Sequence, residues 1–257
     1  MAAAMPEPRE PNPWLVRARP DPRAALRVFC YPYAGGGASV FRTWPDALPE
    51  DIEVVALEPP GRERRSREAP FDQLAPLVES LADGVAPLLD RPYAIYGHSL
   101  GALVGFALAR ELRRRGAPAP RQLVVSGQRA PQLRLCERIH ERPDAELCAW
   151  LRDLGGMPEA LLREPEIMAY FLPILRADMS VNADALDDEP PLACPIAALG
   201  GDADALVPGD ALDAWRVHTA AGFEHEVFAG GHFFLQTVRG PFLRSLARRL
   251  TRWTAAS

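Results

Sequence analysis

The chain has 257 residues, of which 48% are hydrophobic, and carries a formal net charge of −5 at pH 7. This length suits one large domain with a full core, and the acidic balance argues against nucleic acid as a partner. No apolar run is long enough to span a membrane, and the N-terminal stretch lacks the apolar centre of a signal peptide. We therefore expect a cytoplasmic protein without a membrane partner.

The first half of the chain predicts a leader followed by alternating strands and helices. Residues 1–22 hold many prolines and little apolar material, which predicts a flexible leader before a single domain over 23–257. Strands are predicted at 26–31, 52–57, 93–96 and 122–126, and helices around 40–44, at 74–89 and from the residues after 99 to about 115. This alternation predicts an α/β fold with a mainly parallel sheet covered on both faces.

The stretch at about 130–191 breaks this rhythm. It predicts helices at 143–154, 158–162 and 165–181, with prolines at or near their starts, where a missing N–H costs little. We expect a helical lid insertion whose large apolar residues either form the core of a subdomain or face a substrate channel. Candidates for substrate binding are Met157, Met168, Phe171, Leu172 and Leu175, together with Phe233 from a later segment.

The strand and helix rhythm resumes after the insertion, with strands at 194–199 and 224–228 and helices at 210–221 and 241–253.

Ser99 lies where the predicted strand at 93–96 gives way to a helix. Gly97 and Gly101 flank it in a Gly-x-Ser-x-Gly pattern, the spacing of a nucleophile elbow. That turn is so tight that its flanking positions must be nearly free of side chains, and it pushes the serine hydroxyl out above the sheet. The pattern alone arises by chance in many chains, but the strand before it and the helix of small residues after it favour a nucleophile.

Ser99, Asp204 and His232 each follow the end of a predicted strand. Since the carboxyl ends of parallel strands meet at one edge of the sheet, we expect these side chains to cluster there. Histidine can take the serine proton near neutral pH, and a carboxylate can hold the ring in the required tautomer. The sequence therefore predicts a Ser-His-Asp catalytic triad, in the chain order of α/β-hydrolases.

Other residues compete for two of these roles. Asp202 shares the acid loop, but Asp204 has the Gly-x-x-Asp-x-x-Val placement that starts at Gly201. For the base, one histidine adjoins the serine and would point away from it, and the rest lie within predicted elements. These less favoured histidines are His98, His140, His218 and His225.

The strand at 26–31 ends in the glycine cluster Gly35-Gly36-Gly37. The cluster could be a flexible loop or a phosphate-binding loop, although no phosphate motif is completed. We favour an oxyanion hole in which the backbone N–H groups of Ala34 and Leu100 are the donors. Cys136, His140 and Cys148 could share a helical face but lack a fourth ligand, so we expect no metal and no other cofactor.

Four segments together resemble the type II thioesterases of polyketide and nonribosomal peptide assembly lines, over about residues 26–253. They are Tyr31-Pro32-Tyr33-Ala34-Gly35-Gly36, Gly97-His98-Ser99-Leu100-Gly101, Gly201-Asp202-Ala203-Asp204 and Gly230-Gly231-His232-Phe233-Phe234-Leu235. In the lid stretch, Leu154-Gly155-Gly156 and Leu175-Arg176-Ala177-Asp178 also match. Lipases and esterases share the serine motif, whereas the first and last segments are more specific.

This resemblance implies an α/β-hydrolase fold and an editing thioesterase. Its substrate would be an aberrant or stalled acyl group on the phosphopantetheine arm of an acyl or peptidyl carrier protein, and the family implies a monomer. Carrier proteins are usually acidic, so arginines within Arg62–Arg67, in a run otherwise expected to be a solvated loop, are candidate docking residues. The alternatives are a broad-specificity carboxylesterase, a cyclising or terminal release enzyme, and a non-catalytic binding module on the same fold.

Overall fold

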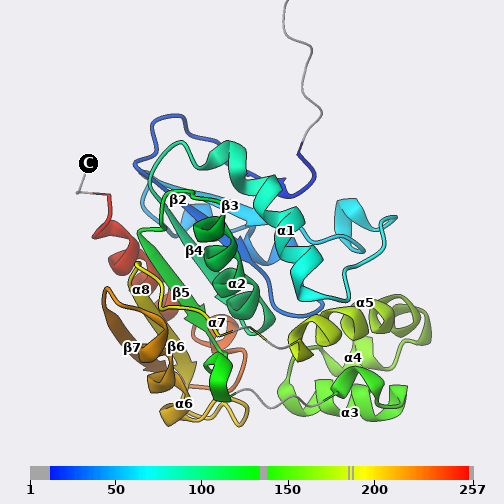
Figure 1. Cartoon of the computed structure of the whole chain (residues 1–257). Coiled ribbons are helices and arrows are strands. Elements are labelled where there is room, and N and C mark those ends of the chain that lie inside the picture. The colour runs from blue at the N-terminus through cyan, green and yellow to red at the C-terminus, as the bar shows by residue number, and fades with distance from the viewer. Residues whose placement is uncertain (1–11, 134–137, 185, 187, 255–257) are drawn as a thin grey trace, which may run out of the picture.

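The computed structural model describes residues 12–133, 138–184, 186 and 188–254. Within these residues seven strands form one sheet in the order β1-β3-β2-β4-β5-β6-β7, with β2 to β7 parallel and β1 antiparallel to β3 (Figure 1). The strands are β1 (Leu15–Val16), β2 (Leu26–Tyr31), β3 (Ile52–Leu57), β4 (Tyr93–His98), β5 (Gln122–Ser126), β6 (Ile196–Gly201) and β7 (Phe223–Phe228). The mainly parallel sheet predicted from the sequence is confirmed.

The helices follow the strands in alternation outside the lid. They are α1 (Leu74–Val85), α2 (Leu100–Arg114), α3 (Asp144–Leu154), α4 (Glu159–Leu162), α5 (Pro165–Ala183), α6 (Gly209–Asp213), α7 (Phe234–Thr237) and α8 (Arg239–Thr251). The helix expected around 40–44 forms instead as two 3-10 turns, Ala38–Phe41 and Trp44–Asp46. The helix expected at 210–221 is also shorter, with α6 running into the 3-10 turn Ala214–His218. Among the described residues, no helix is both long and apolar enough to cross a bilayer.

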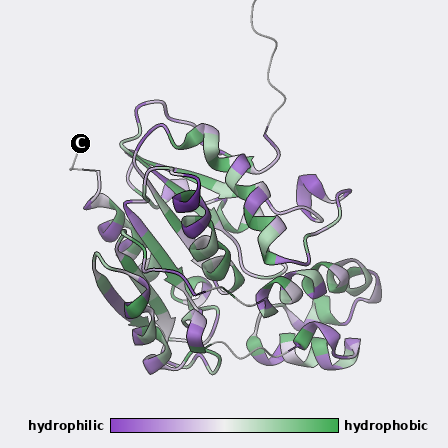
Figure 2. Cartoon of the chain, viewed as in Figure 1, coloured by the Kyte–Doolittle hydropathy of each residue, from purple (hydrophilic) through white to green (hydrophobic). Residues whose placement is uncertain are grey.

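Both faces of the sheet are covered because successive side chains of a strand point to opposite sides. On β4, Tyr93 and Ile95 pack in the cluster that includes α1 and α2. Ala94 and Tyr96 pack in the opposite cluster with α7, α8 and the two 3-10 turns. Figure 2 shows the consequence, since the strands carry mainly hydrophobic residues and the helices are striped. Burying each large apolar side chain in such layers contributes roughly 1.5–3 kcal/mol.

The lid helices α3, α4 and α5 lie together beside the sheet (Figure 1) and have a hydrophobic cluster of their own. Proline stands directly before α3 and α4 and is the first residue of α5, where its missing N–H has no helical partner to lose. The buried members of the cluster are Ile139, Leu147, Leu151, Leu162, Met168, Leu172, Leu175 and Met179. Much of the apolar material of this stretch therefore serves the packing of the lid itself.

Residues 12–22 differ from the flexible leader that the sequence predicted; the rest of that leader lies outside the described residues. Leu15 and Val16 form the edge strand β1 on β3, and Trp14 is buried against α1. The indole Nε1 of Trp14 donates to the Ser80 hydroxyl at 3.2 Å, and the Arg65 guanidinium lies 4.5 Å from the ring centroid. One large aromatic residue thus fixes a segment whose composition alone predicts disorder.

We expect Trp14→Ala to lower the free energy of unfolding by about 3–5 kcal/mol, since it leaves a large cavity under α1. The measurement is equilibrium denaturation in urea. Arg23→Ala is the control, because that side chain lies a few residues further along the chain and is 90% exposed. It should change the free energy of unfolding by no more than about 0.5 kcal/mol. Equal, small effects of both changes would show that the segment contributes nothing to stability.

Candidate active site

Ser99 occupies a strained turn between β4 and α2. Its backbone has φ 54° and ψ −120°, a conformation that residues other than glycine rarely adopt. Its N–H donates to the carbonyl of Ser126 at 2.7 Å, which ties the turn to the end of β5. A Cβ on Gly97 would overlap the backbone of Gly101, and a Cβ on Gly101 would overlap the carbonyl of Tyr31. Both glycines are therefore required by close backbone contacts, as the sequence pattern predicted.

His232 and Asp204 meet next to this turn, at the carboxyl ends of β7 and β6. Nδ1 of His232 lies 2.8 Å from Oδ2 of Asp204, and both side chains are buried. The other carboxylate oxygen accepts the Leu206 N–H at 2.9 Å, which fixes the acid. Because a carboxylate can only accept, Nδ1 carries the proton and Nε2 is left as the basic nitrogen.

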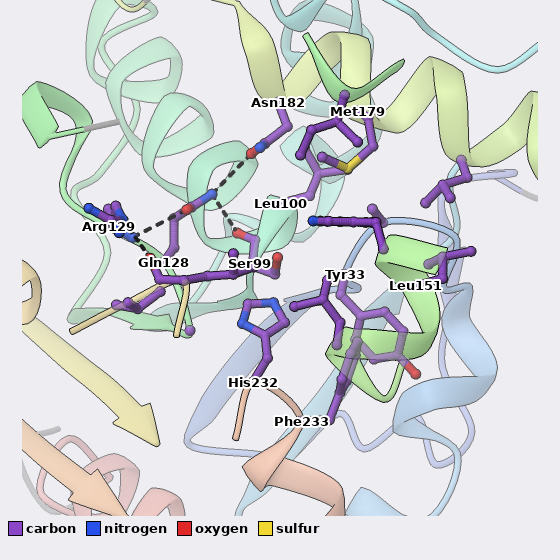
Figure 3. A pocket seen from close by; sticks show the side chains of 18 residues that line it. Tyr33, Ser99, Leu100, Gln128, Arg129, Leu151, Met179, Asn182, His232 and Phe233 are labelled. Atoms are coloured by element: carbon purple, nitrogen blue, oxygen red, sulfur yellow. Dashed lines mark hydrogen bonds between the residues drawn. The ribbon is translucent and has the colours of Figure 1, made fainter. Parts of the chain in front are cut away.

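Ser99 and His232 line one cavity of about 130 Å³ beneath the lid, and Figure 3 shows the His232 ring beside the serine. Ala34 and Leu100 line the same cavity. In the described part of the chain, neither of their backbone N–H groups has a hydrogen-bond acceptor. The cavity thus combines a hydroxyl, a basic nitrogen and two free N–H donors, the set needed for nucleophilic attack on a carbonyl.

The competing residues lie elsewhere. Asp202 is exposed and accepts the Gly230 N–H at 2.8 Å. His225 bonds Asp213 on the exposed side of β7, and His218 lies next to Gln132. His140 is on a 3-10 turn of the lid and does not line the cavity. The geometry therefore leaves one acid and one histidine for Ser99.

The comparisons with known proteins agree with this geometry. The protein-family model of the thioesterase domain matches residues 26–254 of this chain. The chain belongs to the thioesterase family.

Relatives of this thioesterase cover nearly its whole length. Gramicidin S biosynthesis protein GrsT of Aneurinibacillus migulanus is 41% identical over 241 residues, which are 93% of this chain and 94% of GrsT. The RedJ thioesterase from the prodiginine pathway of Streptomyces coelicolor has a TM-score of 0.84 at 38% identity, covering 96% of each chain. The type II thioesterase BorB from the borrelidin cluster also scores 0.84, at 34% identity over 93% of this chain and 98% of BorB. The resemblance to type II thioesterases and the α/β-hydrolase fold are confirmed.

The lid candidates divide into two groups in this thioesterase. Leu175 and Phe233 line the cavity. Met168, Leu172, Met157 and Phe171 do not line it; the first two are buried in the lid's own cluster and the other two pack against that cluster. The sequence pattern of the lid predicts helices with apolar residues, but it does not show which side of each helix faces the cavity.

The remaining cavity wall was not singled out as substrate-binding from the sequence. It is formed by residues of the lid, of the segment after β5 and of the acid loop, and by one tyrosine after β2: Ile139, Trp150, Leu151, Leu154, Met179 and Asn182; Gly127, Gln128 and Arg129; Leu206 and Val207; and Tyr33. Gln128 joins two parts of the site, because its amide nitrogen donates to the Ser99 carbonyl at 3.3 Å and to Asn182 Oδ1 at 3.0 Å (Figure 3). The only sequence signal for Gln128 was its place at a strand end.

His98 supports the site from below. Its ring is fully buried, its Nδ1 lies 2.9 Å from the Ser126 hydroxyl, and its centroid is 5.2 Å from that of His232. Burial lowers the pKa of His98 well below its ordinary value, and the proximity of His232 lowers it further. A neutral His98 avoids placing a second cation beside the imidazolium that forms on His232.

The arginine run at 62–67 is only partly the solvated loop that the sequence predicted. Arg62 and Arg65 are buried. Arg65 is paired with Glu68 at 2.6 Å and stacks on Trp14, and Arg62 is paired with Asp178. These two arginines hold the fold together and are not available as docking residues. The prediction of solvent exposure was wrong for these two residues because the planar guanidinium of arginine can be buried where a carboxylate and backbone carbonyls accept its hydrogen bonds.

No cluster of three or more potential metal ligands occurs among the described residues. Cys136, one member of the group considered from the sequence, lies outside them.

We expect Ser99→Gly to unfold with a free energy about 1 kcal/mol higher than Ser99→Ala, the reverse of the usual order. Relief of the positive φ is worth roughly 1–3 kcal/mol, which exceeds the roughly 0.5–1 kcal/mol that glycine normally costs. Both variants lack the hydroxyl, so the comparison isolates the backbone. Urea denaturation measures it, and a more stable alanine variant would show that the turn is unstrained.

We also expect the thioesterase to lose stability below about pH 6.5 through His98, by up to about 1.4 kcal/mol per pH unit. The folded-state pKa is lowered, so the unfolded chain takes up the proton first as pH falls, and the stabilisation is complete only above the unfolded value. His98→Asn, which can keep the bond to Ser126, should unfold with a shallower pH dependence between pH 7.5 and 5.0. Identical slopes in the wild-type and His98→Asn proteins would contradict the assignment.

Proposed function

We propose that this protein is an editing thioesterase that hydrolyses acyl groups from the phosphopantetheine arm of acyl or peptidyl carrier proteins. The observation that carries the proposal is the meeting of Ser99 with the His232–Asp204 pair in one mainly apolar cavity under the lid. Membership in the thioesterase family supplies the reaction class. The roles of the individual residues are inferred from their geometry.

In the first half of the reaction, Ser99 Oγ attacks the thioester carbonyl carbon while Nε2 of His232 takes the hydroxyl proton. The negative charge that forms on the carbonyl oxygen is held by the N–H groups of Ala34 and Leu100. The carbon–sulfur bond then breaks, the acyl group stays on Ser99, and the thiol leaves with the proton from His232. Asp204 holds the ring so that Nε2 faces the serine throughout.

In the second half, water attacks the acyl-serine carbonyl and gives one proton to His232. The tetrahedral intermediate uses the same two donors, the bond from carbon to Ser99 Oγ breaks, and the proton returns to the serine. The products are a carboxylic acid and a free thiol. The carrier arm would then be restored to the state in which it accepts a new acyl group.

The source of the substrate is argued from the relatives. GrsT is named for gramicidin S biosynthesis, RedJ for the prodiginine pathway and BorB for the borrelidin cluster. Assembly lines of this kind carry their intermediates as thioesters. The apolar wall that α3 and α5 contribute, with Trp150, Leu151 and Met179, suits the hydrocarbon part of an acyl group.

The deciding experiment compares one acyl group in three forms: a carrier-protein thioester, a cysteamine thioester and an oxygen ester. We expect the carrier-bound form to be hydrolysed fastest. Ser99→Ala should lower turnover of all three by roughly 10⁴-fold or more, because it removes the nucleophile. Release of free thiol measures the two thioesters, and release of acid measures the ester.

Each other outcome has a definite meaning. Preference for the oxygen ester would replace the proposal with a general carboxylesterase. Formation of a lactone or lactam in place of the acid would identify a release enzyme. No Ser99-dependent turnover, together with no labelling by a serine-reactive phosphonate, would identify a binding module.

A further inference from the structure

A carboxylate of the lid helix α5 binds the backbone beside the proposed oxyanion hole. Oδ2 of Asp178 accepts the Gly35 N–H at 2.7 Å, and Gly35 follows Ala34 directly. Tyr33 to Gly36 form a turn in which the Gly36 N–H donates to the Tyr33 carbonyl at 2.9 Å. Gly35 has φ 76°, which marks a type II turn. The bond to Asp178 therefore selects the orientation of the central peptide of this turn.

Arg62 also bonds this turn, and it balances the charge of Asp178. Its Nη1 and Nη2 lie 2.6 and 2.8 Å from the two oxygens of Asp178, and Nη1 also donates to the Gly36 carbonyl at 3.1 Å. Both side chains are buried, with 6% and 2% exposed. An unpaired carboxylate here would oppose a developing oxyanion, whereas the paired one holds the Gly35 N–H with little net charge.

One turn later, the same helix is linked through Gln128 to the peptide that carries the second donor, the Leu100 N–H. Asn182 accepts from Gln128 at 3.0 Å, and Gln128 donates to the carbonyl of Ser99 at 3.3 Å. That carbonyl belongs to the peptide whose nitrogen is the Leu100 N–H. Asp178 and Asn182 are four residues apart, so they lie on one face of α5.

The packing of Phe171 strengthens this connection. Phe171 is two turns before Asp178 on the same face, and a Cβ on Gly35 would overlap its ring. The turn at Gly35 and helix α5 therefore fit together closely enough that one cannot shift without the other.

We propose that α5 positions both donors of the oxyanion hole, the Ala34 N–H through Asp178 and Arg62 and the Leu100 N–H through Asn182 and Gln128. These four are positioning residues, because none is required to touch the reacting atoms. The lid is then part of the catalytic apparatus as well as a cover. The inference rests on the oxyanion hole assigned in the proposed function.

The test uses matched double variants that leave no buried unpaired charge. Arg62→Met with Asp178→Asn keeps an acceptor for the Gly35 N–H, whereas Arg62→Met with Asp178→Leu removes it at similar volume. We expect kcat for a cysteamine thioester to be about 10- to 100-fold lower in the leucine variant than in the asparagine variant, with KM within about threefold, since a displaced donor weakens transition-state binding.

A second pair keeps the test decisive if Arg62→Met prevents folding. Asn182→Thr retains a neutral oxygen acceptor for Gln128 and Asn182→Val, of nearly the same shape, does not, so the valine variant should again have the lower kcat. Amide hydrogen exchange by NMR gives a readout apart from activity: Gly35 should exchange faster in the Asp178→Leu variant than in its asparagine partner. Equal kcat values within both pairs would overturn the inference.

Failure of the proposed function can be told apart from failure of this inference. The oxyanion hole serves oxygen esters and thioesters alike. If the wild-type protein prefers the oxygen ester, the thioesterase proposal fails, and the same pairs are compared on that ester.

Discussion

The constraint on which the rest of the structure depends is the strained backbone of Ser99. A residue other than glycine at φ 54° and ψ −120° persists only where its surroundings leave no alternative. Here the close contact of β4 with α2 at Gly97, the contact of Gly101 with the end of β2, and the bond from Ser99 to β5 hold it in place. The close packing of three central strands is thus what exposes one hydroxyl.

Buried charge in this protein is concentrated where orientation matters. Asp204 and His232 form one buried pair, and Asp178 and Arg62 form another beside the turn that carries Ala34. Removing a charged group from water costs several kcal/mol, so each of these carboxylates is stable only because hydrogen-bond donors face both of its oxygens. In return, a buried carboxylate with fixed partners holds a hydrogen-bond donor more firmly than a solvated one could.

Local patterns were enough to predict much of the fold and the central residues of the site. The strand ends that carry Ser99, Asp204 and His232 follow from periodicity and glycine placement, because parallel strands bring their carboxyl ends to one edge. Contacts between distant segments could not be predicted. The docking of Trp14 on α1 and the burial of Arg62 depend on partners 66 and 116 residues away along the chain. Which lid residues face the cavity likewise depends on how α3 and α5 turn against each other.

The separate hydrophobic cluster of the lid has a consequence for how such enzymes can diversify. Because α3 to α5 bury most of their apolar side chains in a cluster of their own, a foreign lid would have to match the layers that cover the sheet mainly at Val181 of α5. It must also match the polar seam along α5, where Asp178 faces Arg62 and Gly35 and Asn182 faces Gln128. That seam defines the boundary along which chimeras of this protein should be cut.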